Sequence, residues 1–123
     1  MQKELPLLGP VQGITRVPAN LVSLCRTSGE AVLLAIRYGQ KTQRQVANDI
    51  GMEPAQLSRI VSGSAHMPAD TAIAFARAVK NWGWQQWVAF SAGMEMVPRV
   101  ESPEERVARL EQRVRELEFV EAA

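Results

Sequence analysis

The sequence contains too few reactive side chains to suggest an enzyme. It has a single cysteine, Cys25, and a single histidine, His66, among its 123 residues. It also lacks a glycine-rich phosphate loop and any cluster of potential metal ligands, so we expect no catalytic residues, no metal and no cofactor. One cysteine cannot form an internal disulfide, which suits a reducing cytoplasm. We expect Cys25 to be a small apolar residue in or near the core.

Long apolar runs and strand patterns are also missing. No segment approaches the roughly 20 apolar residues that a membrane helix needs, so no membrane association is expected. Pro6 and Pro10 interrupt the leucines near the N-terminus, and we expect no signal peptide there. No stretch alternates apolar and polar residues as half-buried strands do. With an ordinary hydrophobic content of 46%, the sequence predicts an all-α globular protein.

The most informative stretch covers residues 42–62, TQRQVANDIGMEPAQLSRIVS, and predicts two short helices joined by a tight turn. Ala47 is small enough for two helices to cross closely there, and Gly51 suits the turn. Four apolar side chains can point inward: Val46, Ile50, Leu57 and Ile60. This layout is that of a helix-turn-helix, whose second helix fits a DNA major groove.

Further helices are expected on both sides of this pair. Ser28 is expected to cap a helix that ends at Tyr38, followed by Gly39 with a positive φ. Its inward face would consist of Ala31, Leu34, Ala35 and Tyr38. Thr42 is the expected cap of a helix over 43–50. The next helix is expected to run from Glu53 or Pro54 to Gly63, and a fourth over 68–79.

An aromatic segment follows at residues 81–90, NWGWQQWVAF. Trp84, Trp87 and Val88 share one helical face, with Phe90 near its edge, and Trp82 is expected to fill the junction before Gly83. Aromatic clusters can stack on bases or bind ligands. The helical spacing favours a role in the core or in a subunit interface.

A last helix carries a coiled-coil pattern. Ser102, Pro103 and Glu105 form a typical capping-box start. The heptad a and d positions are occupied by Val107, Leu110, Val114 and Leu117, and the flanking g and e positions by Arg106, Arg113, Glu111 and Glu118. Valine at a, leucine at d and these charges favour a parallel pair, because an antiparallel pair would bring like charges together. Alternatively, this short helix packs back on its own domain.

Charge is unevenly distributed along the chain despite a net charge of +1. Residues 26–80 carry seven basic and four acidic side chains, whereas residues 101–123 carry four basic and seven acidic ones. The basic part includes the predicted helix-turn-helix over 42–62, although the positive charge of this part is modest. We expect three parts: a mostly irregular arm over 1–27, a four- to five-helix domain over 28–97 and a coiled-coil helix over 102–121.

The predicted site follows from the exposed side chains of the helix pair. Glutamine can bridge adenine N6 and N7, arginine can bridge guanine O6 and N7, serine can donate to a base, and an alanine methyl can contact thymine. The expected base-contacting residues are Ala55, Gln56, Ser58 and Arg59. Side chains at the start of a helix often hold phosphate. The expected phosphate-contacting residues are Lys41, Thr42, Gln43, Arg44, Ser62, Ser64 and His66.

These residues also carry a family resemblance. Gln43, Ala47, Gly51, Leu57, Ile60 and Gly63 match the pattern of the phage-repressor helix-turn-helix family (Cro/C1, XRE-type). The runs at 56–59 and 78–83 also resemble the phage CII-type activators. The resemblance implies a lambda-repressor-like fold and an oligomeric transcriptional regulator in the cytoplasm of a bacterial host, at the nucleoid. It also implies RNA polymerase as a further partner of an activator. The acidic heptad tail is not part of the repressor pattern.

Two functions therefore compete at the level of sequence. The leading hypothesis is a sequence-specific regulator that binds double-stranded DNA as a dimer or a higher oligomer such as a tetramer. The alternative is a protein-interaction module, such as an antitoxin or anti-regulator, that uses the same helices against a protein.

Overall fold

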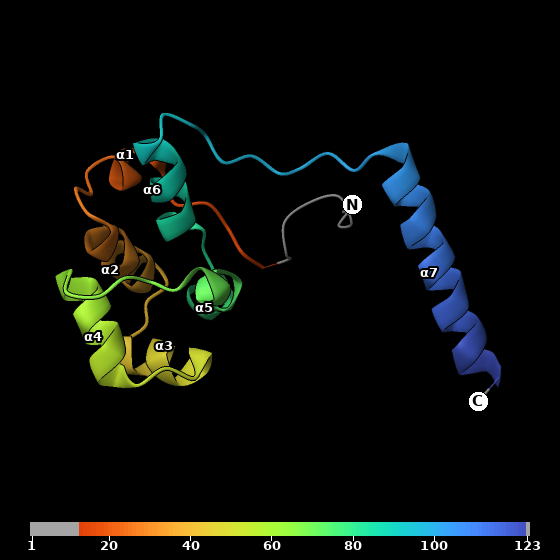
Figure 1. Cartoon of the computed structure of the whole chain (residues 1–123), viewed down its shortest axis with the longest axis horizontal. Coiled ribbons are helices and arrows are strands. Elements are labelled where there is room, and N and C mark those ends of the chain that lie inside the picture. Colours follow the sequence, from red (N-terminus) through yellow and green to blue (C-terminus); the bar gives the residue numbers. More distant parts are fainter. Residues whose placement is uncertain (1–12, 123) are drawn as a thin grey trace. The chain divides into compact units, whose positions relative to one another are not determined.

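The computed structural model describes residues 13–122, and all regular elements in this range are helices, so the all-α prediction is confirmed there. An isolated parallel bridge joins Thr15 and Asn81. Residues Gly13–Val97 form one compact unit, and the last helix belongs to a second unit (Figure 1). The helices are α1 (Ala19–Val22), α2 (Ser28–Tyr38), α3 (Gln43–Ile50), α4 (Pro54–Ser62), the 3-10 turn η2 (Ala69–Thr71), α5 (Ala72–Val79), α6 (Gly83–Ser91) and α7 (Pro103–Ala122).

The chain joins the compact unit at residue 13, earlier than expected. Thr15 N–H donates to the Lys80 carbonyl at 3.1 Å, and Trp82 N–H donates back to the Thr15 carbonyl at 2.9 Å. Val17 and Val22 are almost fully buried. Residues 13–27 are therefore not an arm, because long-range hydrogen bonds and apolar burial hold them to the domain. The first part of the predicted arm, residues 1–12, lies outside the described residues.

Helix α2 lies at the centre of the compact unit and contacts α1, α4, α5 and α6. Its buried face consists of Ala31, Val32, Ala35 and Ile36, which differs from the expected face because Tyr38 is 43% exposed. Thr27, rather than Ser28, caps the helix by accepting from Glu30 N–H at 3.1 Å. Ser28 has another partner, since its hydroxyl accepts from the Trp84 indole N–H at 2.9 Å.

Gly39 ends α2 for a reason that local sequence does not reveal. Its φ is −77°, so the predicted positive φ is wrong, and Gln40 adopts the left-handed conformation instead. A Cβ atom at Gly39 would overlap the Val79 carbonyl oxygen. Glycine is needed here because the end of α5 approaches the backbone closely.

The predicted helix over 68–79 is divided into two parts. Thr71 N–H and the Thr71 hydroxyl both donate to the Pro68 carbonyl, at 3.1 and 2.8 Å. This i to i+3 bonding makes η2, and the regular α5 begins only at Ala72.

A buried asparagine connects α5, α6 and α2. Asn81 donates from Nδ2 to the carbonyls of Ala35 and Val79, each at 3.0 Å, and its Oδ1 accepts from Gly83 N–H at 2.9 Å. Only 1% of Asn81 is exposed. Since all three polar bonds are made internally, this side chain fixes the start of α6 against the middle of the domain.

The aromatic residues of the segment 81–90 mainly pack on the domain. Trp82 is buried, and Trp84 and Trp87 are half-buried. The Trp87 indole N–H donates to the Cys25 carbonyl at 3.0 Å, and partial burial raises the pKa of the Cys25 thiol. Phe90 remains 52% exposed. The expected core role is therefore confirmed for Trp82 and for Trp84, which packs against the core, whereas the exposed Phe90 leaves the subunit-interface alternative open.

Candidate nucleic-acid interface

Helices α3 and α4 form where the sequence predicts them, and a tight turn joins them. Thr42 starts α3 with a complete capping box, in which its hydroxyl accepts from Gln45 N–H and the Gln45 side chain accepts from Thr42 N–H. Gly51 ends α3 with a φ of 71°, in the left-handed region that favours glycine. Pro54 occupies the first turn of α4.

The inward faces of the two helices are well packed. Val46 and Ala47 of α3 and Leu57 and Ile60 of α4 are at most 1% exposed and share one core with α2 and α5. Ile50 is only partly buried and lies against that core. The packing fixes the rotation of α4 about its own axis, and this rotation determines which of its side chains face solvent.

The predicted base-contacting residues lie on the outer side of α4. Ala55, Ser58 and Arg59 are exposed, and Gln56 is half-buried. The structure brings two of them together, because Arg59 Nη2 donates to Gln56 Oε1 at 2.6 Å. One amide oxygen lone pair is thereby used, while the Gln56 Nε2 group keeps its two donors for an outside acceptor.

The predicted phosphate-contacting residues at the start of α3 differ in availability. Arg44 is exposed, Gln43 is half-buried, and the Thr42 hydroxyl accepts the capping bond. Lys41 Nζ lies 3.0 Å from Asp49 Oδ2, and both side chains remain partly exposed. Such surface pairs typically contribute only about 0–1 kcal/mol, so a phosphate can compete for this lysine.

The side chains of Ser62 and Ser64 form hydrogen bonds at the C-terminal end of α4. Both hydroxyls approach the Arg59 carbonyl, at 3.0 and 3.3 Å, and they lie 3.2 Å from each other. These bonds close the helix around Gly63, whose φ is 92°. Each hydroxyl has one proton, and both protons can be used within this end structure. His66 is exposed beyond it.

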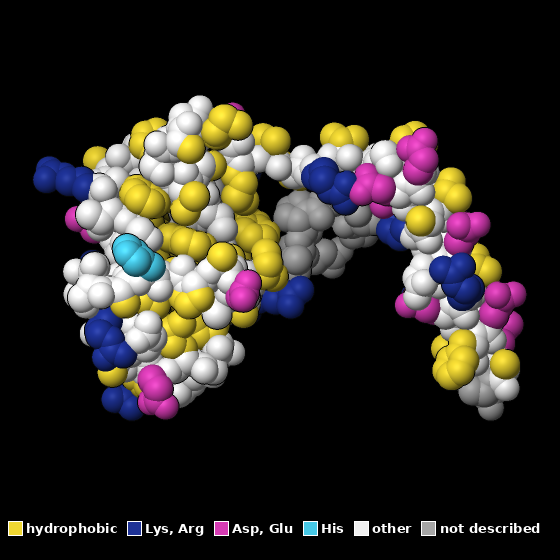
Figure 2. Space-filling view, in the orientation of Figure 1, with side chains coloured by type: hydrophobic (Ala, Val, Ile, Leu, Met, Phe, Trp, Pro, Cys, Tyr) yellow, Lys and Arg dark blue, Asp and Glu magenta, His cyan; other side chains and the backbone are white. Residues whose placement is uncertain are grey.

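Charge on this face is mixed. Residues 41–66 carry three Lys or Arg side chains and two acidic ones. In Figure 2, dark-blue basic side chains and the cyan His lie on the side of the compact unit where Figure 1 places α4, with a magenta acidic side chain nearby. Gln45 was not among the predicted site residues although it is exposed beside them. The Thr-x-x-Gln spacing of the capping box could have identified its role.

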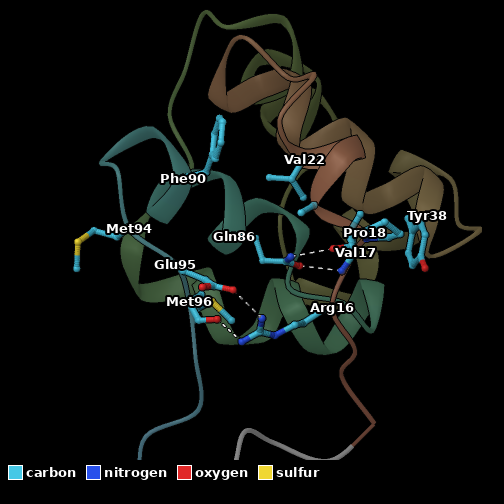
Figure 3. A pocket seen from close by; sticks show the side chains of 11 residues that line it. Arg16, Val17, Pro18, Val22, Tyr38, Gln86, Phe90, Met94, Glu95 and Met96 are labelled. Atoms are coloured by element: carbon cyan, nitrogen blue, oxygen red, sulfur yellow. Dashed lines mark hydrogen bonds and ion pairs between the residues drawn. The ribbon is translucent and has the colours of Figure 1, made fainter.

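A pocket of about 550 Å³ lies elsewhere in the compact unit, between α1, α6 and the residues after α6 (Figure 3). The Gln86 amide spans its floor, accepting from Val17 N–H at 2.8 Å and donating to the Val17 carbonyl at 2.9 Å. Arg16 binds Glu95 and the Met96 carbonyl at the rim (Figure 3). These polar groups satisfy one another, so the pocket has the character of a structural junction.

The predicted oligomerisation residues all belong to α7. Its apolar positions Val107, Leu110, Val114 and Leu117 are 47–55% exposed. The charged residues beside them, Arg106, Glu111, Arg113 and Glu118, are exposed too. Within this helix, Figure 2 shows hydrophobic side chains between basic and acidic ones.

Comparison with family models, with curated proteins and with solved structures finds no match to this chain. Within residues 13–122, no group of three or more His, Cys, Asp or Glu side chains could hold a metal ion. None of the helices in that range combines the length and apolar surface needed to cross a bilayer.

Proposed function

We propose that this protein is a sequence-specific DNA-binding transcriptional regulator of phage or prophage type. In this proposal, the compact unit is a lambda-repressor-like helix-turn-helix domain, and α4 enters the major groove. The observation that carries the proposal is the orientation of α4. Leu57 and Ile60 hold it on the core, and Ala55, Ser58 and Arg59 face solvent. A short helix held in this way, after a glycine turn, can present its first two turns to base edges.

Each side chain then has a defined task. Arg59 donates to guanine O6 and N7, and Gln56 donates from Nε2 to a neighbouring base acceptor while Arg59 orients its amide. Ser58 supplies a hydroxyl, and the Ala55 methyl packs on a thymine methyl. Lys41, Thr42, Gln43 and Arg44 hold the phosphates beside the start of α3, because helix N-termini attract anions. His66 extends this contact after α4, and Ser62 and Ser64 extend it when their hydroxyls exchange the Arg59 carbonyl for a phosphate.

One α4 helix offers few base contacts, so the proposal includes a dimer or higher oligomer on repeated half-sites. Two copies of the reader would bind half-sites about 34 Å apart, or a multiple of this distance. Contact with RNA polymerase remains an expectation from the family resemblance and has no surface assigned to it.

Selection of bound sequences from a random DNA pool tests this proposal directly. We expect enrichment of a repeated half-site and an affinity that falls steeply with salt, because bound phosphates release counterions. Arg59→Ala should weaken the selected site by at least about fivefold relative to random DNA, since a bidentate base contact contributes about 1–3 kcal/mol. Arg26→Ala, which removes an exposed arginine before α2, is the matched control. Equal losses on selected and random DNA would refute the base-reading role.

The protein-interaction module is the second candidate, and the mixed charge of the α3–α4 face favours it. Two acidic side chains offset three basic ones there, and the hydroxyls of Ser62 and Ser64 have partners within the protein. Failure to bind any DNA at low salt, together with stoichiometric co-purification of a protein, would replace the first proposal by this one.

A further inference from the structure

The residues before α7 fold back on the first turns of this helix. Glu101 accepts from Arg109 Nε and Nη2 at 2.8 and 3.2 Å, and its side chain is only 8% exposed. Arg99 pairs with Glu105. The Ser102–Glu105 capping box lies within the same segment, with bonds of 2.9 and 3.1 Å. The start of α7 is therefore a defined structure with a bidentate ion pair and a reciprocal cap.

These contacts cover the outer side of the first two turns of α7, whereas the opposite side remains exposed among the residues that the structure describes. Glu105 and Arg109 occupy heptad positions f and c, opposite the a and d positions. The a and d residues carry aliphatic side chains that remain about half exposed: Val107, Leu110, Val114 and Leu117. An apolar stripe of this kind, with its first turns held on the outer side, is typical of a helix that pairs with another helix.

The stripe contains a shallow, open hollow. It is lined by Val107, Leu110, Glu111 and Val114, together with Arg115. Their spacing of i, i+3, i+4 and i+7 is that of the four residues that surround a knob in knobs-into-holes packing. The four occupy heptad positions a, d, e and a. In a parallel pair, a hole of this composition receives the d side chain of the facing helix.

We propose that α7 pairs in parallel and in register with α7 of a second copy of this chain, and that the partner's Leu110 fills the hollow. Charge complementarity identifies the occupant. In this register the partner's Arg106 lies beside Glu111, and the partner's Arg113 lies beside Glu118. An antiparallel pair would instead place arginine beside arginine and glutamate beside glutamate.

The observations that support the pairing come from α7 alone. What the pairing would do for DNA binding rests on the proposed function. In a parallel pair, the two preceding chain segments leave from the same end. Both copies of the compact unit are then connected to one end of the coil. This connection suits a regulator that binds two neighbouring half-sites, whereas in an antiparallel coil the two compact units would be connected to opposite ends.

Disulfide trapping in the full chain tests the orientation. In a Cys25→Ser background, Leu117→Cys places a thiol at a d position that meets its own copy only in a parallel, in-register pair. Glu116→Cys, at the outer c position, is the matched control. After mild oxidation we expect at least tenfold more cross-linked dimer for Leu117→Cys than for Glu116→Cys. Equal yields, or a dimer by mass that Leu117→Cys does not trap, would refute the parallel pairing.

The mass in solution tests the role of the hollow. Leu110→Asp should raise the dimer dissociation constant at least tenfold, because it removes the knob and puts a charge in the hole. Gln112→Asp, an outer position of the same helix, should leave it unchanged. A monomeric wild-type chain that binds its selected DNA with full affinity would overturn the pairing alone. A stable, trapped dimer that binds no DNA would overturn the proposed function alone.

Discussion

Replacing Gly29 by alanine probes the contact that positions α4. Gly29 lies in the first turn of α2, where this helix crosses the end of α4. A Cβ atom at this position would lie 2.8 Å from the Ile60 carbonyl oxygen and would overlap that of Val61. These obstacles are backbone atoms, so no side-chain rotation can make room. The two helices must move apart, and the core between them must repack.

Two opposing effects determine the magnitude. Alanine is intrinsically better than glycine in a helix by about 1 kcal/mol. Overpacking a core costs typically 1–3 kcal/mol, and a backbone obstacle places this contact in the upper part of that range, at about 2–3 kcal/mol. We therefore expect a net loss of about 1–2 kcal/mol in the free energy of unfolding. For a domain of this size, the loss corresponds to a fall in Tm of roughly 5–15 °C.

Thermal unfolding followed by circular dichroism measures the loss, and DNA affinity measured well below Tm reports the displacement of α4. Gly93→Ala is a suitable comparison. Gly93 has a φ of 76°, which alanine rarely adopts, but a Cβ atom at this position would meet no neighbouring atom. It should lower Tm without changing DNA affinity. An unchanged or higher Tm for Gly29→Ala would refute the close crossing of α2 and α4.

Three further predictions concern polar groups. Asn81→Ala should destabilise the compact unit by about 2–4 kcal/mol in urea unfolding, because it removes three buried hydrogen bonds that contribute about 0.5–1.5 kcal/mol each. A loss below about 1 kcal/mol would contradict this role. The losses of DNA affinity from Gln56→Ala and Arg59→Ala should be non-additive by at least 0.5 kcal/mol in a double-mutant cycle, because the two side chains share a hydrogen bond; strict additivity would show that they act independently. The pKa of Glu105 is lowered to about 2 by the Ser102 backbone N–H, then by the Arg99 guanidinium and the Ser102 hydroxyl. The carboxylate therefore stabilises the start of α7 at pH values above its ordinary pKa of 4.5, and this contribution is lost as the pH falls towards 2. The helical circular dichroism of the wild type should exceed that of Glu105→Gln at pH 7 and converge with it near pH 2, and a difference independent of pH would refute the charge effect.

The elements that sequence reasoning located correctly depend on neighbours within one or two helical turns. The cap at Thr42, the glycine turn at Gly51 and the Ser102–Glu105 cap involve residues at most a few positions apart. Local side-chain chemistry and backbone sterics suffice to predict such features. The inward positions of α3 and α4 followed similarly from helical periodicity.

Apart from the helix over 68–79, which local bonds between Thr71 and Pro68 divide in two, the main predictions that proved wrong involve residues distant in the chain. The predicted arm over 1–27 is too long, because a Pro- and Gly-rich segment gives no sign of the hydrogen bonds that join Thr15 to residues 80–82. The reason for Gly39 is a carbonyl of α5. Ser28 lost its predicted capping role to Thr27, and it instead accepts a bond from Trp84. In each of these three cases the deciding atom belongs to a residue far away in the sequence.

The sequence by itself determined the helical class, the ends of α3, α4 and α7, and the heptad pattern, since hydrogen bonds within a helix and the 3.6-residue repeat are local properties. Only the tertiary structure decided that the domain begins at Gly13 and that Asn81 connects three helices. It also decided that Gly29 permits the close approach of α2 and α4, and that Glu101 and Arg109 cover the outer side of the first turns of α7. These features depend on which surfaces meet after the chain has folded, and burial and close approach become defined only there.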